Sequence, residues 1–497
     1  MSRPNALHLG RPLALAALIA SLGCSSNDAP SKPPVTPYDD FSSGSLSGAK
    51  WSEGQHQTVI DNQSAALSHA ISGVRRNTAY GNVLSMISPA NSVVTTLKVE
   101  IQITSTNFTG DTTLRSGIDL WFQPAANRLG PTHLTNSLFA RISFLASMNG
   151  LVVLRQLFEC TADDCSTVSA IGMASGDWLG PGLPFSLATP YTIAISVNPV
   201  AKIFTFSISG GAYTTPKTST IDASAVTSPF PVDLSPSNFY RARLACQIRG
   251  GSNGGGNGAV RAQYDNVNVG FDGAVASLFD DFASATSFDS AKWSVGKEIV
   301  QIVNSSLQLA LSQKDTPATV PLNLTDSGVS ALQTDVTVSQ WSLTGQGRLV
   351  ARIEGALYND GSNGSGTAPD INRPGSQVGD VLASISMNAT IVSSLVIRCD
   401  AANCSSFTPI HPPTTLGSVT LGSPHTLLLW WDPSSHKINF QLDDRPPATF
   451  DPVAASHPVV SAPSVPFRQI AVRAGPINPT DTFTGSITAS FDNVKTM

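Results

Sequence analysis

Residues 191–208, YTIAISVNPVAKIFTFSI, decide the fold class of this 497-residue chain. Apolar residues alternate with polar or small ones on both sides of Asn198-Pro199. An alternation with a period of two is expected of a strand with one buried face, and the Asn-Pro pair predicts a turn. The stretch therefore predicts an antiparallel β-hairpin.

The same pattern extends to both sides of this hairpin. Further strand candidates, separated by Gly, Pro and Asn turns, lie at 97–103, 151–158, 381–387 and 391–397. Only 13% of the residues are Asp, Glu, Lys or Arg, which is unfavourable for solvated helices. Many short alternating strands without helical spacing predict an all-β, antiparallel β-sandwich. A net charge of -5 without a run of Lys or Arg argues against nucleic acid as a partner.

The chain also contains an internal duplication with five landmarks in one order. The landmark pairs are Asp39-Asp40-Phe41 and Asp280-Asp281-Phe282, Ala49-Lys50-Trp51 and Ala291-Lys292-Trp293, Cys160 with Cys165 and Cys399 with Cys404, 191–206 and 425–440, and 264–267 and 491–494. They predict two tandem jelly-roll domains, 39–271 and 279–497, joined by a linker at 272–278.

The N-terminus is interpreted as an export signal. Arg3 and Arg11 precede an apolar stretch that is too short to span a membrane, so residues 1–23 are predicted to be a signal peptide. Ser21-Leu22-Gly23-Cys24 resembles the lipobox of bacterial lipoproteins, although its leucine is two rather than three places before the cysteine. The resemblance implies a lipid on Cys24; ordinary cleavage nearby is the alternative.

The segment after Cys24 is predicted to be a disordered tether over 24–38, because it is rich in Pro and Ser and lacks apolar periodicity. The membrane would then be a partner through the lipid anchor. The lipoprotein resemblance, with Ser25 rather than Asp after the cysteine, implies the outer membrane of a Gram-negative bacterium.

Each copy has framework motifs that point to a known family. The opening Asp-Asp-Phe with a later Trp, the hairpin ending near Asp432-Pro433 and the closing Phe-Asp-Asn-Val at 491–494 resemble the laminin-G-like, concanavalin A-like lectin/glucanase jelly rolls. The resemblance implies that the first and last strands of a domain are neighbours. It also implies a class that includes carbohydrate-binding modules, adhesion domains and glycan-cleaving enzymes.

Six cysteines suit an exported chain. Cys160 with Cys165 and Cys399 with Cys404 are predicted to form two small disulfides, each with four residues between its cysteines. Zinc ligation is the alternative, but no histidine lies nearby. Cys246 lies in an alternating strand and is predicted to be a buried, inert thiol.

No catalytic constellation is visible in the sequence. Retaining glycosidases of this superfamily need two carboxylates on one strand, about 5–5.5 Å apart. Glu100 and Asp119 each place one acid in an apolar strand without a second. The polysaccharide lyases' cluster of Arg, Gln, His and Tyr is not found either.

Four aspartates are candidate calcium ligands, since calcium takes oxygen ligands and is common in such jelly rolls. They are Asp40, Asp265, Asp281 and Asp492. The favoured interpretation is that they accept backbone hydrogen bonds at turns.

Trp430 is the best ligand-stacking candidate. Alignment of the hairpins places Trp431 at the inward position of Val197 and Trp430 at the outward position of Ser196. An exposed indole can stack on the C–H face of a sugar. The sequence therefore predicts a surface lipoprotein that binds carbohydrate or another surface ligand without cleaving it. A polysaccharide hydrolase or lyase and a structural envelope protein are the alternatives.

Overall fold

Burial along the hairpin follows the alternation of its sequence. In β11 (Pro190–Asn198) the side chains of Tyr191, Ile193 and Ile195 are buried, while the residues between them are partly exposed. The strand pairs antiparallel with β12 (Ile203–Gly210) from Tyr191↔Gly210 to Asn198↔Ile203, as the sequence predicts.

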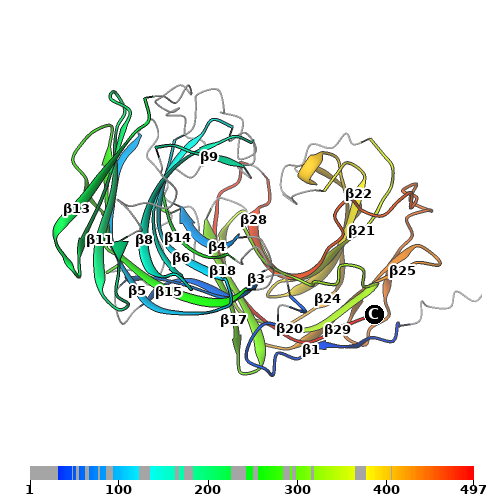
Figure 1. Cartoon of the computed structure of the whole chain (residues 1–497). Coiled ribbons are helices and arrows are strands. Elements are labelled where there is room, and N and C mark those ends of the chain that lie inside the picture. Colours follow the sequence, from blue (N-terminus) through cyan, green and yellow to red (C-terminus); the bar gives the residue numbers. More distant parts are fainter. Residues whose placement is uncertain are drawn as a thin grey trace, which may run out of the picture. The chain divides into compact units, whose positions relative to one another are not determined.

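The computed structural model contains three antiparallel sheets and one 3-10 turn, η2 (Ala402–Cys404), within the described residues (Figure 1). The described residues are 32–47, 49–51, 55–61, 66–75, 79–85, 93–122, 135–162, 167–172, 183–224, 242–249, 256–283, 292–293, 298–314, 318–363, 376–404, 406–478 and 480–497.

The largest sheet has 16 strands. In hydrogen-bonding order its main path is β13 (Tyr213–Asp222), β12, β11, β5 (Val94–Thr109), β15 (Gly256–Phe271), β3 (Ala66–Arg75), β2 (Gln55–Asp61), β17 (Glu298–Val303), β18 (Ser306–Lys314), β29 (Phe483–Thr496), β20 (Ala331–Gly345), β25 (His425–Asp432), β26 (Lys437–Leu442) and β27 (Ala448–Phe450). Two short strands lie off this path: β1 (Thr36–Asp39) pairs with β29, and β16 (Ser277–Asp280) pairs with β15.

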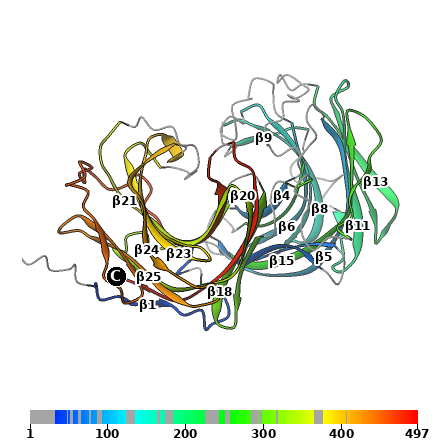
Figure 2. The same cartoon turned by 180° about the vertical axis from the view of Figure 1, so that it is seen from behind.

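The other two sheets are smaller. The seven-stranded sheet has the order β10 (Leu183–Pro184), β8 (Gly150–Cys160), β7 (Leu138–Ser147), β6 (Thr113–Phe122), β14 (Ala242–Arg249) and β4 (Ala79–Ser85), with β9 (Val168–Ala170) beside β8. The six-stranded sheet has the order β19 (Ala318–Asn323), β28 (Arg468–Pro476), β21 (Gly347–Asn359), β22 (Asp380–Met387), β23 (Ile391–Cys399) and β24 (Phe407–Ser418) (Figure 2).

Two large hydrophobic clusters lie between these sheets. The first core joins β5, β11, β12 and β15 to the seven-stranded sheet, through residues such as Val99 and Ile118. The second core joins β18, β20, β25 and β29 to the six-stranded sheet, through residues such as Val336 and Ile353. The fold class is therefore the predicted all-β, antiparallel sandwich.

The two copies exchange their opening segments. Phe41 and Trp51 of the first copy belong to the second core, and β1 pairs with β29 at the C-terminal end of the chain. Conversely, Phe282 and Trp293 of the second copy belong to the first core, and β16 pairs with β15. Each first strand therefore lies beside the last strand of the other copy, and not beside the last strand of its own copy as the family resemblance implies.

The exchanged segments have matching internal geometry. Trp51 Nε1 donates to Asp39 Oδ2 at 2.7 Å, and Trp293 Nε1 donates to Asp280 Oδ2 at 2.8 Å. Each tryptophan also stacks on the phenylalanine of its own motif, at centroid distances of 5.7 Å for Trp51 and 5.6 Å for Trp293. The aspartate, phenylalanine and tryptophan make the same contacts in both motifs. The two motifs therefore present similar apolar surfaces to the cores in which they pack.

The strands that follow the two opening segments pair with each other. β2 and β17 pair antiparallel, with Ile299 opposite Gln57. Gln57 and Ile299 are each the sixth residue after the motif tryptophan of their copy. The pairing therefore relates equivalent residues of the two copies and makes the large sheet continuous.

Four predicted ranges differ from the structure. The predicted tether, 24–38, overlaps strand β1, and the predicted linker, 272–278, is largely the turn between the paired strands β15 and β16. The boundaries 39–271 and 279–497 also leave each opening segment with the wrong core. Residues 33–497 form one compact unit. Residues 1–23, including the predicted signal peptide, lie outside the described residues, as does Cys24.

Candidate functional site

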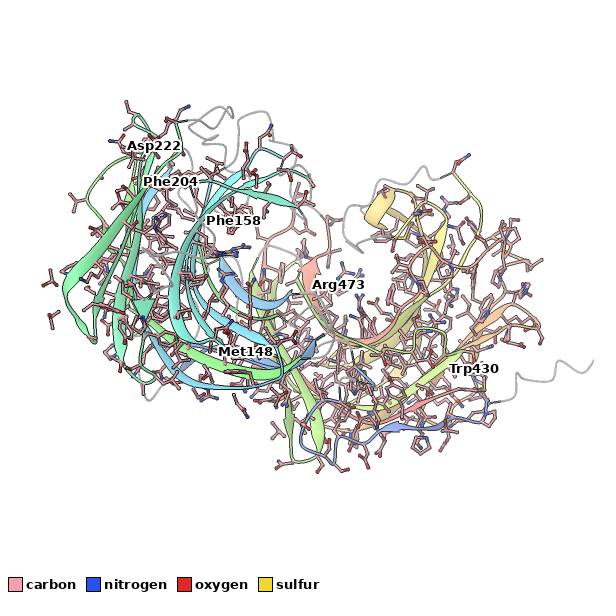
Figure 3. The ribbon with its side chains drawn as sticks, viewed as in Figure 1. Met148, Phe158, Phe204, Asp222, Trp430 and Arg473 are labelled. Carbon is pink, nitrogen blue, oxygen red and sulfur yellow. A yellow bond between two sulfur atoms is a disulfide. The ribbon has the colours of Figure 1, made fainter. Side chains whose placement is uncertain are left out.

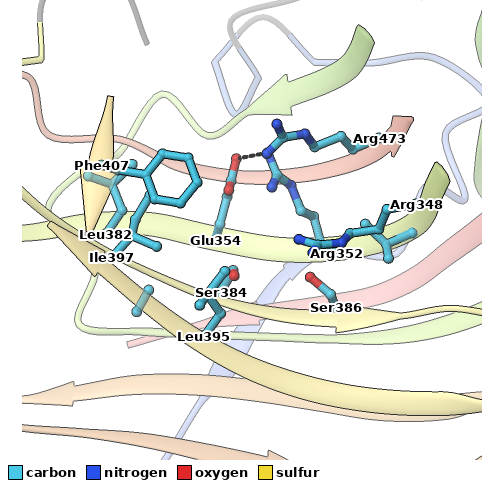
Figure 4. Close-up of a pocket in the computed structure, with 12 residues that line it drawn as sticks. Arg348, Arg352, Glu354, Leu382, Ser384, Ser386, Leu395, Ile397, Phe407 and Arg473 are labelled. Atoms are coloured by element: carbon cyan, nitrogen blue, oxygen red, sulfur yellow. Dashed lines mark hydrogen bonds and ion pairs between the residues drawn. The ribbon is translucent and has the colours of Figure 1, made fainter. Parts of the chain in front are cut away.

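A pocket lies on the face of the six-stranded sheet that points away from the second core (Figure 4). Its cationic part contains Arg348, Arg352 and Arg473, beside the carboxylate of Glu354. Figure 4 shows apolar side chains on the other side of the carboxylate, and these include Phe407. The pocket therefore offers charged groups and apolar surface next to each other.

Strand alternation places these groups. Along β21, Leu349 and Ile353 enter the second core, while Arg352 and Glu354 lie on the opposite face. β28 pairs with β21 and brings Arg473 opposite Val350. The cationic part thus combines residues of two neighbouring strands that are more than 100 positions apart in the sequence.

The carboxylate of Glu354 is held in a buried network. Arg352 Nη2 donates to Glu354 Oε1 at 2.8 Å, and the side-chain amide of Gln469 donates to the same oxygen. Arg352 and Glu354 are 5% and 3% exposed, whereas Arg348 is exposed and Arg473 is half-buried. The two latter guanidinium groups are therefore the accessible cations of the pocket.

The first copy has a charged cluster at the equivalent place. In the first copy Asp119 lies opposite Arg141 of β7 and Arg243 of β14. In the second copy Glu354 lies opposite Ser384 of β22 and Gln469 of β28. Each acid follows an isoleucine that points into its core. The sheet register therefore makes Asp119 and Glu354 equivalent.

Asp119 is completely buried among three arginines. Arg141 Nε and Arg243 Nε each donate to a carboxylate oxygen at 2.7 Å, and Arg115 donates through Nη2. Burial alone would raise the pKa of Asp119, but the three positive charges outweigh it and hold that pKa well below its usual range. Arg243 also stacks over Trp121, 4.6 Å from the ring centroid.

Smaller side chains explain why the second copy has a pocket at this position. Where the first copy has Arg141, the second has Ser384, and where the first has Trp121, the second has Ala356. Trp121 stacks on Phe139 at 4.5 Å, so these rings cover the sheet in the first copy. Serine and alanine fill less space beside Glu354 than arginine and tryptophan would, although Ser384 and Ala356 are themselves buried.

The prediction that Trp430 is exposed is wrong. Its side chain does point away from the second core, as the alternation predicts, but it is only 4% exposed (Figure 3). It packs with Ala331, Leu428 and Val35, and Val35 immediately precedes the exchanged strand β1. The exchanged segment therefore covers this indole and leaves it no surface on which a ligand could stack.

The four candidate calcium ligands accept local hydrogen bonds, Asp40 and Asp281 just after short strands and Asp265 and Asp492 at bulges within β15 and β29. Asp40 Oδ1 accepts from Ser42, and Asp281 Oδ1 accepts from the Ala283 backbone N–H at 3.1 Å. Asp265 and Asp492 accept from the backbone N–H of the residue that follows each of them. Within the part of the chain that the structure describes, no group of three or more His, Cys, Asp or Glu side chains could hold a metal ion. The geometry thus does not support the calcium hypothesis.

The cysteines largely follow the sequence predictions. Cys399 and Cys404 form the predicted disulfide, with an S–S distance of 2.03 Å. Cys160 is disulfide-bonded, and its predicted partner Cys165 lies outside the described residues. Cys246 is completely buried, and its Sγ lies 3.1 Å from Ser116 Oγ. Burial raises the pKa of this thiol to about 11.

Cys246 is accordingly expected to resist alkylation in the folded protein. At about pH 8 almost none of this thiol is ionised, and the thiolate is the reactive form. We expect iodoacetamide to leave Cys246 unmodified in the native protein and to label it in urea, as measured by peptide mass spectrometry. Rapid native labelling would contradict the buried position.

The sequence-based search missed the arginines and the glutamate of the pocket. Arg348, Arg352 and Glu354 occupy alternate positions of one strand, which is the one local signal that points to them. Their apposition with Arg473 depends on the pairing of β21 with β28. The two acids on one strand that a retaining glycosidase requires do not occur among the described residues that line this pocket.

No helix in the described ranges is long and apolar enough to cross a membrane. No protein-family model matches the chain, and neither does any curated protein. Among solved structures, xylan β-1,4-xylosidase from Bacillus halodurans C-125 matches over 88% of this chain and 98% of its own, at 8% identity and a TM-score of 0.23. A likeness this weak carries no argument about fold or function.

Proposed function

We propose that this protein binds carbohydrate at the cell surface without cleaving it, through the pocket on the six-stranded sheet, and that it is held at the membrane by a lipid on Cys24. One observation carries the binding proposal: the pocket combines arginine and serine donors with the apolar side chains of Leu382, Ile397 and Phe407. Sugars present hydroxyl groups at their rim and C–H groups on their faces, so they match a surface of this kind.

The groups that line the pocket favour binding over cleavage. Glycosidases use two carboxyl groups about 5–9.5 Å apart. Among the described residues that line the pocket, Glu354 is the one carboxylate, and it is paired with Arg352. Glu354 accepts hydrogen bonds from Arg352 and Gln469, and a glycosidase would need a second carboxyl group beside it.

The first copy provides the substitution that tests this site. Ser384→Arg places in the pocket the residue type that the first copy has at the equivalent position, Arg141. We expect the full chain to bind glycans on an array and the Ser384→Arg variant to lose that binding, because the larger side chain occupies the pocket.

Ser342→Arg is the matched control, since Ser342 is exposed on strand β20 of the other sheet. It should bind as the unmodified chain does. Equal binding by the Ser384→Arg variant would exclude this pocket as the site, and an array without any bound glycan would overturn the proposed function.

A further inference from the structure

The charges of the pocket indicate the class of its ligand. Its lining has three guanidinium groups and one carboxylate, and Arg352 pairs with that carboxylate at 2.8 Å. Whatever other pairs form within the lining, its charges sum to a net excess of two positive charges. The whole chain carries a net charge of -5, so this local excess is opposite in sign to the protein.

The accessible cations lie on one side of the pocket. Arg348 and Arg473 are the less buried of its arginines, and Figure 4 shows both on the side opposite Phe407. Guanidinium groups present parallel N–H donors that match the two oxygens of a carboxylate or sulfate. A neutral sugar hydroxyl has no charge to offset theirs.

The apolar side of the pocket restricts the ligand further. Phe407 is half-buried beside Leu382 and Ile397, which are each 3% exposed. An aromatic ring in this position can receive the C–H face of a pyranose. A small inorganic anion beside the arginines would not cover the partly exposed ring of Phe407, so the pocket fits an anion that is attached to a ring.

The comparison between copies supports the same inference. The first copy has three arginines around Asp119, and its aromatic side chains Trp121 and Phe139 cover the sheet. In the second copy Glu354 accepts from Arg352 and Gln469, and the pocket is also lined by Arg348, which is exposed, and Arg473, which is half-buried. The cations thus face the ligand space in the second copy.

We propose that the pocket of the second copy binds an acidic saccharide, whose carboxylate or sulfate group contacts Arg348 and Arg473 while its ring lies against Phe407. This inference rests on the proposed function, because it names the chemical class of the carbohydrate. The negative charge supplies specificity, and the apolar contact positions the ring.

The test compares acidic sugars with neutral sugars of similar structure. Binding of the full chain to trigalacturonic acid, to its fully methyl-esterified form and to a sulfated galactose trisaccharide is measured by calorimetry, beside an array of uronates, sialylated and sulfated sugars with neutral counterparts. We expect an acidic sugar to bind at least about tenfold more tightly than its neutral counterpart. Added salt should weaken the binding.

Variants locate the charge effect. Arg348→Ser, alone and combined with Arg473→Ser, should reduce affinity for the acidic sugar by about tenfold or more. Arg261→Ser is the matched control, because Arg261 is exposed on β15 in the first copy. The exposed position of Arg348 lets the single variant be tested even if the double variant is less stable, which urea unfolding would report.

The outcomes separate the two proposals. Equal affinity for acidic and neutral members of each pair would overturn the inference and leave carbohydrate binding intact. Acid-selective binding that is unaffected by Arg348→Ser would place the anion elsewhere and would also overturn it. Absence of binding to every sugar would overturn the proposed function itself. The carboxylate and sulfate arms identify which acidic group is preferred.

Discussion

Trp51→Ala is expected to destabilise the second core, although residue 51 belongs to the first sequence copy. Trp51 is 1% exposed, packs among residues of the second core and donates a hydrogen bond to Asp39. Truncation of a buried tryptophan costs about 3–5 kcal/mol, because apolar contacts are lost and a cavity is left. Native-state amide hydrogen exchange should show faster exchange in β29 and β18, with little change in β5 and β15.

Trp293→Ala provides the reciprocal control. Trp293 has the same hydrogen bond to its own aspartate but packs in the first core, so its loss should accelerate exchange in β5 and β15. If Trp51→Ala instead weakened β5 and β15, each opening segment would pack with its own copy and the exchange would be wrong.

Asp119→Asn is expected to produce the second large effect. This carboxylate is fully buried and ion-paired with Arg115, Arg141 and Arg243. Removal of one partner from a buried charge network costs about 3–5 kcal/mol, since the remaining charges lose their compensation. The urea concentration at the unfolding midpoint should fall accordingly.

The pH dependence of this effect follows from the lowered pKa of Asp119. The unfolded chain protonates the carboxyl near its ordinary pKa of about 3.9, while the folded chain keeps it ionised. The stability that Asp119 contributes is therefore complete above about pH 5 and declines as the pH falls through the pKa of the unfolded chain. The difference between wild type and Asp119→Asn should shrink in the same range.

Asp222→Asn is the control for this experiment, because Asp222 is exposed and accepts a turn hydrogen bond from Ser224 that asparagine can also accept. Its unfolding midpoint should stay close to that of the wild type. An Asp119→Asn variant as stable as this control would show that the arginine cluster does not depend on its carboxylate.

The position of Trp430 shows how far strand alternation predicts a site. Alternation correctly places its side chain on the face away from the second core. It does not predict that Val35, almost 400 residues earlier, packs against that face. Exposure is set by every segment that reaches a surface, whereas alternation reports only the direction in which a side chain leaves its own strand.

The pocket illustrates the same difference. Arg348, Arg352 and Glu354 alternate on one strand, but the sequence does not indicate whether their neighbours are large or small. The register of β21 with β22 places Ser384 beside Glu354, where the first copy has an arginine. The pocket therefore depends on cross-strand neighbours, which a single strand does not encode.

The sequence by itself determined the all-β fold class, the Cys399–Cys404 disulfide and the burial of Cys246, because each depends on local spacing or on a period of two along one strand. The tertiary structure alone decided which core receives each opening segment, what covers Trp430 and where the arginines meet. Both opening motifs have the same internal contacts, so their local sequence is compatible with either core. Their partners are determined by the pairing of β1 with β29 and of β16 with β15, between strands that the predicted boundaries place in different parts of the chain.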